Sequence, residues 1–499
     1  MIHEEGRPGQ FARGMASSAH HSVLAALDNS SLSGFHFRTM LTSGMGFFTD
    51  AYDLFIIGAV LAILTPLWHL NALEISLLGS TSLIAAALGA VIFGWLADRL
   101  GRKFIYGYEL IVLAIGAIAS ALAPNVIFLL IFRFILGLGI GGDYPVSATL
   151  MSEYSNRKDR GKLITLVFSM QGLGLIFGPL VAIVLLLVGI NHDITWRIML
   201  ALGAIPALAT FYLRRHIAET PRFTLTMQGN LEDASRTVDM VTRKQTGRTN
   251  TALSLQKNAA SNGHISKSQT PKKSWLYLLV TPRFLRWLIG TAGAWFLLDI
   301  AYYGTTISSP LVLKALNGHA NLITNMLYTL IIFVVAALPG YIVAALTIDR
   351  LGRKWIQVVG FGMMTVAYGL IALFPAISSI TVPFLLVYGL SYFFTEFGPN
   401  VTTFVYPAEI FPVMVRTTAH GIAAALGKVG AFIGAFAFPF LLSTYHLPGA
   451  MAAAAIVSIL GLVLTVFTLP EPNQRSLEEI SDEHTVRAEH EERELVLSK

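Results

Sequence analysis

Cysteine is absent from this 499-residue chain, and charged residues make up only 13% of it. The absence of cysteine excludes disulfide bonds, c-type haem attachment, and cysteine-ligated zinc or iron–sulfur sites. Soluble domains carry about 25% charged residues, whereas 54% of this chain is hydrophobic. The composition is therefore that of an integral membrane protein.

Several signatures of enzymes and of secretion are also missing. The chain shows no glycine loop of the kind that cradles phosphate, no metal-ligand spacing, and no nucleophile–base pair that can be placed together. We therefore expect no enzyme activity, no catalytic residue, no metal and no cofactor. The first 36 or so residues are polar and lack an apolar core followed by a cleavage site, so no removable signal peptide is expected.

Long apolar segments account for most of the chain. Twelve of them approach the roughly 20 residues that cross a bilayer as a helix. They lie at about 40–66, 75–97, 104–123, 126–151, 161–188, 196–215, 284–312, 322–347, 355–374, 380–404, 415–442 and 449–469. The sequence predicts an all-α membrane protein whose twelve transmembrane helices form two six-helix bundles, at 40–215 and 284–470.

Lysine and arginine are distributed unequally between the loops. The short loops after even-numbered segments hold eleven of them, and the opposite short loops hold only Lys314. The eleven are Arg99, Arg102, Lys103, Arg157, Lys158, Arg160, Lys162, Arg350, Arg353, Lys354 and Arg416. By the positive-inside rule, both termini are predicted to be cytoplasmic, in a plasma membrane or bacterial inner membrane.

Polar segments flank the two bundles. Residues 1–39 are predicted to be a cytoplasmic tail, 216–283 a mobile cytoplasmic linker, and 471–499 an acidic cytoplasmic tail. From Arg236 to Lys273 the linker has eight Lys/Arg and a single acid. This charge suits anionic lipid headgroups better than nucleic acid, and no obligatory protein partner is indicated.

The two halves of the chain repeat each other. Residues 98-DRLGRK-103 recur as 349-DRLGRK-354, and Asp50 and Asp299 occupy matching positions. Duplicated bundles are the plan of transporters that work by alternating access, with the substrate site between the halves. Ten charged residues at the cytoplasmic ends of the repeat are predicted to latch one conformation, in a gating and structural role: Asp98, Arg99, Arg102, Glu153, Arg160, Asp349, Arg350, Arg353, Glu409 and Arg416.

An acid lies inside the seventh apolar segment, in 294-AWFLLDIAYYG-304. Asp299 has no basic residue close in sequence, and a lone carboxylate in hydrocarbon costs on the order of 3 kcal/mol. Trp295, Asp299 and Tyr303 follow one another at i, i+4 and i+8, so a helix places them on one face. A packed aromatic stripe would explain the two aromatic residues, but the acid favours a polar site.

Six motifs together resemble the major facilitator superfamily, and more narrowly its phosphate:proton symporters of fungi, plants and microbes. They are 44-GMGFFTDAYDLF-55, 139-GIGGDYPVSATLMSEYSNRKDRG-161, 168-FSMQG-172, 295-WFLLDIAYYG-304, 398-GPNVTTFVYPAEIFP-412 and 419-AHGIAAALGKVGA-431. The duplicated DRLGRK alone marks only the superfamily, whereas GGDYP and WFLLDIAYYG are far more specific. The resemblance covers nearly the whole membrane region.

The resemblance implies a site for inorganic phosphate and a route for protons. The phosphate site would be built by Tyr144, Gln171, Trp295, Asp299, Tyr303 and Asn400. Proton coupling would involve Asp50 and Asp143, with Asp53 on the face of Asp50 and with Lys428 as a nearby charge partner. Position 396 is Glu, where the family is expected to have a neutral amide, and this departure alters the charge near the site.

We therefore expect proton-coupled uptake of inorganic phosphate by alternating access. Phosphate keeps a P–OH at neutral pH, so Asp299 can accept that proton in a charge-assisted hydrogen bond, whereas sulfate has no proton to give. Asp50 is expected to bind the coupled proton, because burial penalises a charged carboxyl group. The first alternative is a proton-coupled carrier of sugars or organic acids, suggested by 218-AETPR-222 and 470-PEPNQRSLEEI-480. The second is a phosphate-binding sensor without net transport, suggested by the basic linker.

Overall fold

The computed structural model describes residues 22–242, 275–309, 312–313, 322–483 and 485. The N-terminal half contains α2 (Gly34–Trp68), α3 (Ala72–Leu100), α4 (Arg102–Ile105), α5 (Tyr108–Ala121), α6 (Val126–Tyr154), α7 (Arg160–Val188), α8 (His192–Ala201) and α9 (Ala204–Arg214). Between the halves lie α10 (Pro221–Phe223), the π-helix η1 (Thr224–Gln228), α11 (Leu231–Thr242) and the 3-10 helix η2 (Trp275–Val280). The C-terminal half contains α13 (Pro282–Ile307), α15 (Leu322–Ile332), the π-helix η3 (Phe333–Ala337), α16 (Leu338–Leu351), α17 (Arg353–Leu373), the 3-10 helix η4 (Pro375–Ser379), α18 (Thr381–Phe397), α19 (Pro399–Ile410), α20 (Arg416–Thr468) and α21 (Leu477–Ser481).

Ten helices in the described residues are long and apolar enough to cross a membrane. Two further spans come from helix breaks. The predicted span at 380–404 is formed by α18 and α19, which follow each other across Gly398. The long helix α20 is two helices joined at His446, whose φ of 57° interrupts the helical backbone. All twelve predicted spans are therefore present, and the all-α prediction is confirmed.

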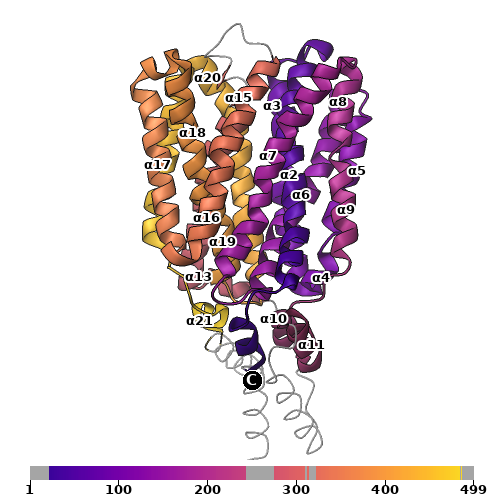
Figure 1. The fold of residues 1–499 in the computed structure, drawn as a ribbon, viewed down its shortest axis with the longest axis vertical. Coiled ribbons are helices and arrows are strands. Elements are labelled where there is room, and N and C mark those ends of the chain that lie inside the picture. Colours follow the sequence, from indigo (N-terminus) through magenta and orange to yellow (C-terminus); the bar gives the residue numbers. More distant parts are fainter. Residues whose placement is uncertain (1–21, 243–274, 310–311, 314–321, 484, 486–499) are drawn as a thin grey trace, which may run out of the picture.

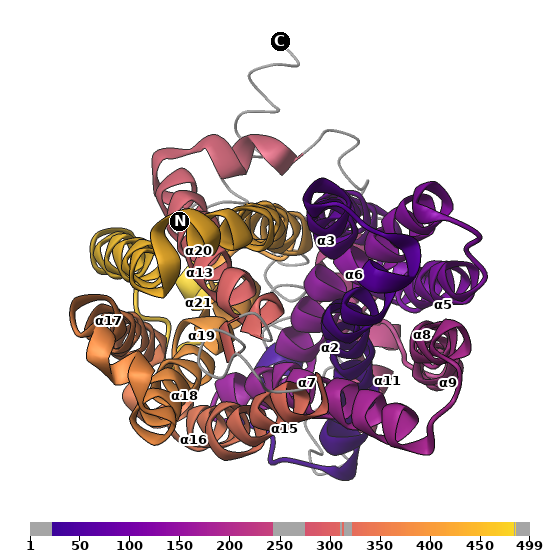
Figure 2. The same cartoon turned by 90° about the horizontal axis from the view of Figure 1, so that it is seen from above.

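The helices α2–α9 and α13–α20 form two groups that stand side by side (Figures 1 and 2). The groups contact each other along several helices: α3 packs along α20, α7 packs along α15 and α16, and α6 contacts α19 and α20. The crossing of α3 and α20 is close, because a Cβ atom on Gly421 would lie 2.4 Å from the carbonyl oxygen of Ala90. Small residues at such crossings let membrane helices approach each other. The substrate site predicted between the halves therefore lies between two closely packed bundles.

Part of the predicted mobile linker is folded. Residues 221–242 form α10, η1 and α11, and Leu231 and Val238 of α11 pack into one apolar cluster with Leu27 and Ile105. The apolar residues of α11 lie on one face, which explains why this polar helix docks on the N-terminal group. We call the end of the molecule that carries α4, α10, α11 and α21 the basic end (Figure 1, bottom), because the eleven loop lysines and arginines lie there. Most of the basic stretch 236–273 lies outside the described residues.

The beginning of the acidic tail also lies at the basic end. Glu478 of α21 accepts a hydrogen bond from Arg222, with 2.8 Å between Oε1 and Nε, and Arg160 donates to the carbonyl oxygen of Arg475 over 3.1 Å. Burial alone would raise the pKa of Glu478, but the charge and hydrogen bond of Arg222, together with a backbone hydrogen bond and Arg416, lower that pKa. The segment after α20 therefore contacts α10 through an ionised pair, and α7 of the N-terminal group through a hydrogen bond.

Candidate functional site

The helix α13 carries Trp295, Asp299 and Tyr303, and all three side chains are buried, as their spacing predicts. Asp299 does not stand alone in space. Lys428 of α20 lies 3.8 Å away, measured from its Nζ to Oδ2 of Asp299. The lone carboxylate expected from the local sequence therefore has a cation beside it, in agreement with the charge partner that the resemblance implied.

Lys428 also connects the two halves. Its ammonium group donates hydrogen bonds to the hydroxyl oxygens of Tyr144, over 3.1 Å, and of Tyr303, over 2.7 Å. The same nitrogen lies 4.3 Å and 4.6 Å from the centroids of these two rings, which adds a cation–π attraction. Tyr144 belongs to α6 and Tyr303 to α13. A buried cation thus sits where predicted phosphate residues of both bundles meet.

A second polar contact joins the halves through Gln171 and Asn400. Tyr341 of α16 donates to Oε1 of Gln171 over 3.4 Å and accepts a hydrogen bond from Nδ2 of Asn400 over 2.9 Å. Asn400 also donates to the carboxyl group of Glu396. Sequence reasoning missed Tyr341, because nothing in its own segment distinguishes a lining tyrosine from a packed one. All six residues predicted to bind phosphate therefore lie in two hydrogen-bonded or aromatic groups at the bundle interface.

Aromatic rings surround these polar groups. Trp295 lies 6.0 Å from Tyr144 and 5.6 Å from His420 between ring centroids, and Phe55 stacks on Tyr303 at 5.8 Å. Phe47, Phe168 and Phe404 pack around Tyr144. A mostly apolar lining with few convergent polar groups is typical of small-molecule sites.

The predicted proton residues have different surroundings. Neither carboxylate oxygen of Asp50 has a hydrogen-bond partner among the residues described, and its charged neighbours include Asp143, Arg214 and Lys428. Asp143 is held by Arg214 of α9, with 2.8 Å from Nη1 to Oδ1, and Arg214 also contacts Glu109 at 2.7 Å. Members of this buried triad and Lys428 are thus both charged neighbours of Asp50. Sequence reasoning missed Arg214. It lies near the end of the sixth apolar segment, where an arginine is expected to contact the membrane surface and not a buried acid.

Asp53 faces the interior of the N-terminal bundle. Arg133 donates to its backbone carbonyl oxygen, over 3.2 Å and 3.3 Å, and its carboxylate has no hydrogen-bond partner within the described residues. A Cβ atom on Gly203 of the α8–α9 junction would lie 2.2 Å from that carboxylate. Among the residues that the structure describes, the cation that acts on the Asp53 carboxylate is Arg133, and Lys428 does not act on it. The role of Asp53 in proton coupling stays a prediction.

The predicted latch residues form two matching networks at the basic end. Asp98 contacts Arg102 at 3.1 Å and accepts hydrogen bonds from the backbone N–H groups of Thr417 and Thr418, where α20 begins. Asp349 contacts Arg353 at 2.9 Å and accepts hydrogen bonds from the N–H groups at the start of α7, those of Gly161 and Lys162. Each acid thus binds the helix N-terminus of the opposite half, where the helix dipole favours negative charge.

The remaining latch residues divide into buried and exposed. Glu153 lies between Arg102 and Arg416, at 3.2 Å and 3.0 Å, and Glu409 contacts Arg353 at 2.7 Å. Arg160 contacts Asp28 at 3.7 Å. Arg99 and Arg350 are exposed, and Arg99 lies over the ring of Trp95. The latch residues that are buried or half-buried therefore form ion pairs. The gating role of the ten residues stays a prediction.

Removing both helix-terminal acids should open the basic end. Each carboxylate at a partly buried helix N-terminus is worth up to about 2 kcal/mol, so D98A/D349A should raise the ratio of open to closed molecules by up to about a thousandfold. Because the chain has no cysteine, spin labels on introduced cysteines at the exposed positions Arg157 and Trp355 can report the distance between the halves.

The matched control for this variant is R99A/R350A, which changes two exposed charges in the same loops. The control should leave the label distances unchanged. An unchanged distance distribution in D98A/D349A would contradict the latch.

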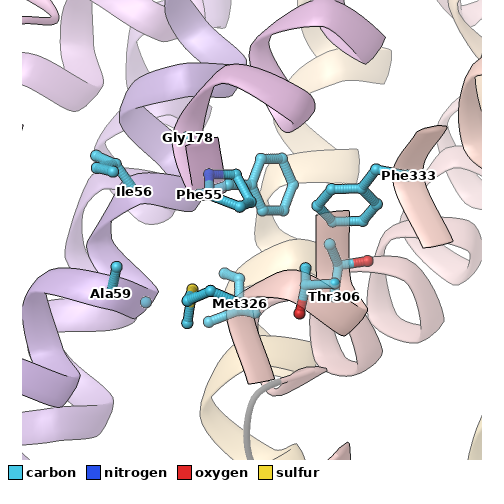
Figure 3. A pocket seen from close by; sticks show the side chains of 11 residues that line it. Phe55, Ile56, Ala59, Gly178, Thr306, Met326 and Phe333 are labelled. Carbon is cyan, nitrogen blue, oxygen red and sulfur yellow. The ribbon is translucent and has the colours of Figure 1, made fainter. Parts of the chain in front are cut away.

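A small cavity lies between the halves on the side of the site away from the basic end. Its volume is about 30 Å³, which is room for about two water molecules. Its lining comes from α2, α7, α13, α15 and η3 (Figure 3): Phe55, Ile56, Gly58, Ala59, Gly178, Pro179, Thr306, Ile307, Met326, Thr329 and Phe333. Charged groups thus close the basic end, whereas the opposite side contains space lined mainly by apolar groups.

Solved structures of a xylose symporter share this fold. The proton:xylose symporter XylE of the major facilitator superfamily, bound to 6-bromo-6-deoxy-D-glucose, has a TM-score of 0.75 and 22% identity, and the match covers 91% of this chain and 99% of that one. The inward-open conformation of XylE from E. coli matches with a TM-score of 0.64 and 20% identity, over 90% and 99% of the two chains.

Plant proteins are more similar in sequence. The chain is 37% identical to a probable inorganic phosphate transporter 1-6 of Arabidopsis thaliana, over 94% of this chain and 98% of that protein. It is 37% identical to inorganic phosphate transporter 1-11 of rice (Oryza sativa subsp. japonica), over 93% and 90%. Residues 39–484 match the family described as "Sugar (and other) transporter". The chain therefore belongs to this family of multi-pass membrane transporters, within the major facilitator superfamily.

Proposed function

We propose that this protein carries inorganic phosphate into the cell together with protons, by alternating access between its two bundles. The observation that supports this most is the position of Lys428, held by Tyr144 and Tyr303 from opposite bundles and 3.8 Å from Asp299. The plant relatives named inorganic phosphate transporters support the choice of anion.

In this proposal Lys428 supplies the positive charge for phosphate, and Asp299 selects for a protonated oxyanion. Asp299 accepts the P–OH hydrogen in a charge-assisted bond, and it repels sulfate, which has no such hydrogen at neutral pH. Five neighbouring side chains can donate to the other oxygens: Tyr144, Gln171, Trp295, Tyr303 and Asn400. Phosphate would then replace the tyrosines as the partner of the ammonium group.

Proton coupling in this proposal depends on Asp50. Its carboxylate lacks hydrogen-bond partners among the described residues, and its charged neighbours include the Asp143–Arg214 pair and Lys428. A proton on Asp50 removes a buried negative charge beside the interface, and that favours one arrangement of the bundles over the other. Asp143 neutralises the charge of Arg214. Because Asp50 is a charged neighbour of both residues, its protonation is linked to the packing of the N-terminal bundle.

We place the basic end in the cytoplasm, in a plasma membrane or bacterial inner membrane. The loop lysines and arginines gathered there support this orientation by the positive-inside rule. Both chain ends would then be cytoplasmic. With the basic end latched by Asp98 and Asp349, phosphate would reach Lys428 from the opposite side, past the cavity lined by Phe55 and Met326.

Uptake of labelled phosphate into proteoliposomes tests this function. An acid-outside gradient should drive accumulation, and its collapse should abolish accumulation, because inward proton flow supplies the energy. Excess sulfate or glucose should not compete. Uptake of labelled glucose together with absent phosphate uptake would support a sugar carrier, and saturable phosphate binding without uptake would support a sensor.

A further inference from the structure

Glu396, one residue before the end of α18, lies beside the residues proposed to bind phosphate. Its side chain is fully buried, and Nδ2 of Asn400 donates a hydrogen bond to its Oε2. Its Oε1 has no hydrogen-bond partner in the described part of the chain. Within that part, no lysine or arginine lies within the 4.0 Å of an ion pair with Glu396. This acid therefore lacks the counter-ion that Asp299 and Asp143 possess.

The helices around Glu396 supply no positive charge to it. Its ionisable neighbours are phenols and one further acid: Tyr302, Tyr303 and Asp299 from α13, Tyr341 from α16, Tyr368 from α17, and Tyr392 one turn earlier on α18. The segments η3 and η4, which also pack on α18, contain no ionisable residue, and α19 contributes Asn400. An ionised Glu396 is thus stabilised mainly by hydrogen bonds.

The hydrogen bond from Asn400 is shared with the phosphate site. Nδ2 of Asn400 has two hydrogens, and in this structure one points to Tyr341 over 2.9 Å and the other to Glu396. If phosphate accepts a hydrogen bond from Asn400, either Tyr341 or Glu396 must lose the hydrogen bond that Asn400 now donates to it. Tyr341 keeps Gln171 as a partner, at 3.4 Å. Glu396 would lose the hydrogen bond from Asn400 and keep only its phenol neighbours, Tyr302 and Tyr341. A buried carboxylate that loses a donor and has no counter-ion is disfavoured.

We propose that Glu396 is a proton-coupling residue that takes up one proton when phosphate withdraws the amide of Asn400. This inference rests on the proposed phosphate function. The proton comes from the aqueous phase on the phosphate side and binds a carboxylate oxygen of Glu396. It leaves to the other side after phosphate dissociates there and Asn400 returns to the carboxylate. One proton would thus move with each phosphate in addition to any proton on Asp50.

The dependence of phosphate affinity on pH tests this inference. If binding takes up a proton at Glu396, raising the pH should weaken binding to the native protein by up to about tenfold more per pH unit than binding to E396Q. The variant should therefore bind phosphate more tightly than the native protein at about pH 8. General structural damage would weaken binding at every pH. Because the two proteins are compared at equal pH, the titration of phosphate itself cancels.

The matched control is E479Q, which changes an exposed glutamate of α21 and should keep the native pH slope. Equal slopes in E396Q and the native protein would overturn the inference and leave the transport function standing. Failure of the native protein to bind phosphate at any pH would instead overturn the transport function.

If E396Q does not fold, infrared difference spectra of the native protein with labelled glutamate replace the binding measurement on the variant. A protonated glutamic acid band should grow when phosphate binds, and its absence would refute the role of Glu396.

Discussion

Replacing Lys428 by methionine should reduce phosphate uptake by about two orders of magnitude or more. Lys428 is buried, and its loss leaves Asp299 without its cation. Breaking a buried ion pair by removing one partner costs about 3–5 kcal/mol. A cost of that size in the phosphate-bound state corresponds to roughly 10² to 10⁴ in binding. The anion would also meet an uncompensated carboxylate. Initial rates of labelled phosphate uptake in proteoliposomes, at matched protein density, measure the effect.

The control for K428M is K158M, which changes an exposed lysine at the basic end and should transport at the native rate. The double variant D299N/K428M separates charge balance from phosphate recognition. It should recover stability relative to K428M, because the Asp299 carboxylate is no longer left without its cation, yet remain unable to transport. Native uptake by K428M would show that phosphate is recognised elsewhere.

Replacing Arg214 by methionine should give the largest loss of stability. Arg214 is fully buried between Asp143 and Glu109, with contacts of 2.8 Å and 2.7 Å, and it also lies 4.1 Å from the ring centroid of Tyr106. Its removal leaves two buried carboxylates without a cation, which should cost about 3–5 kcal/mol. That is a large share of the roughly 5–15 kcal/mol by which proteins are stable. Thermal unfolding in detergent, followed by size-exclusion chromatography, measures the loss.

The neighbouring Arg215 is exposed, so R215M is the matched control and should unfold at the native temperature. Adding E109Q to R214M removes one of the stranded charges and should recover part of the lost stability. If R214M alone unfolds like the native protein, the triad does not stabilise the bundle and Asp143 has another partner.

Local sequence was sufficient for the helices and for the face of α13. Apolar length predicts each span, because no water is available in hydrocarbon to bind an open backbone. Helical spacing predicts that Trp295, Asp299 and Tyr303 share a face. The repeat of DRLGRK predicts that the networks of Asp98 and Asp349 match. Apolar length and helical spacing depend only on residues near one another in the chain.

Packing decided which charges meet. Lys428 reaches Asp299 from α20, and Arg214 reaches Asp143 from α9. The docking of α11 and α21 at the basic end likewise depends on surfaces built from several segments.

The sequence by itself determined the membrane spans, their duplication and the set of polar residues inside them. Only the tertiary structure decided how those residues pair, and that Asp50 and Glu396 remain without a cation within ion-pair distance among the described residues. The physical reason is the distance along the chain over which each effect acts. Hydropathy and helical periodicity act within a segment, whereas the energy of a buried charge depends on the groups that other helices bring within a few ångströms of it.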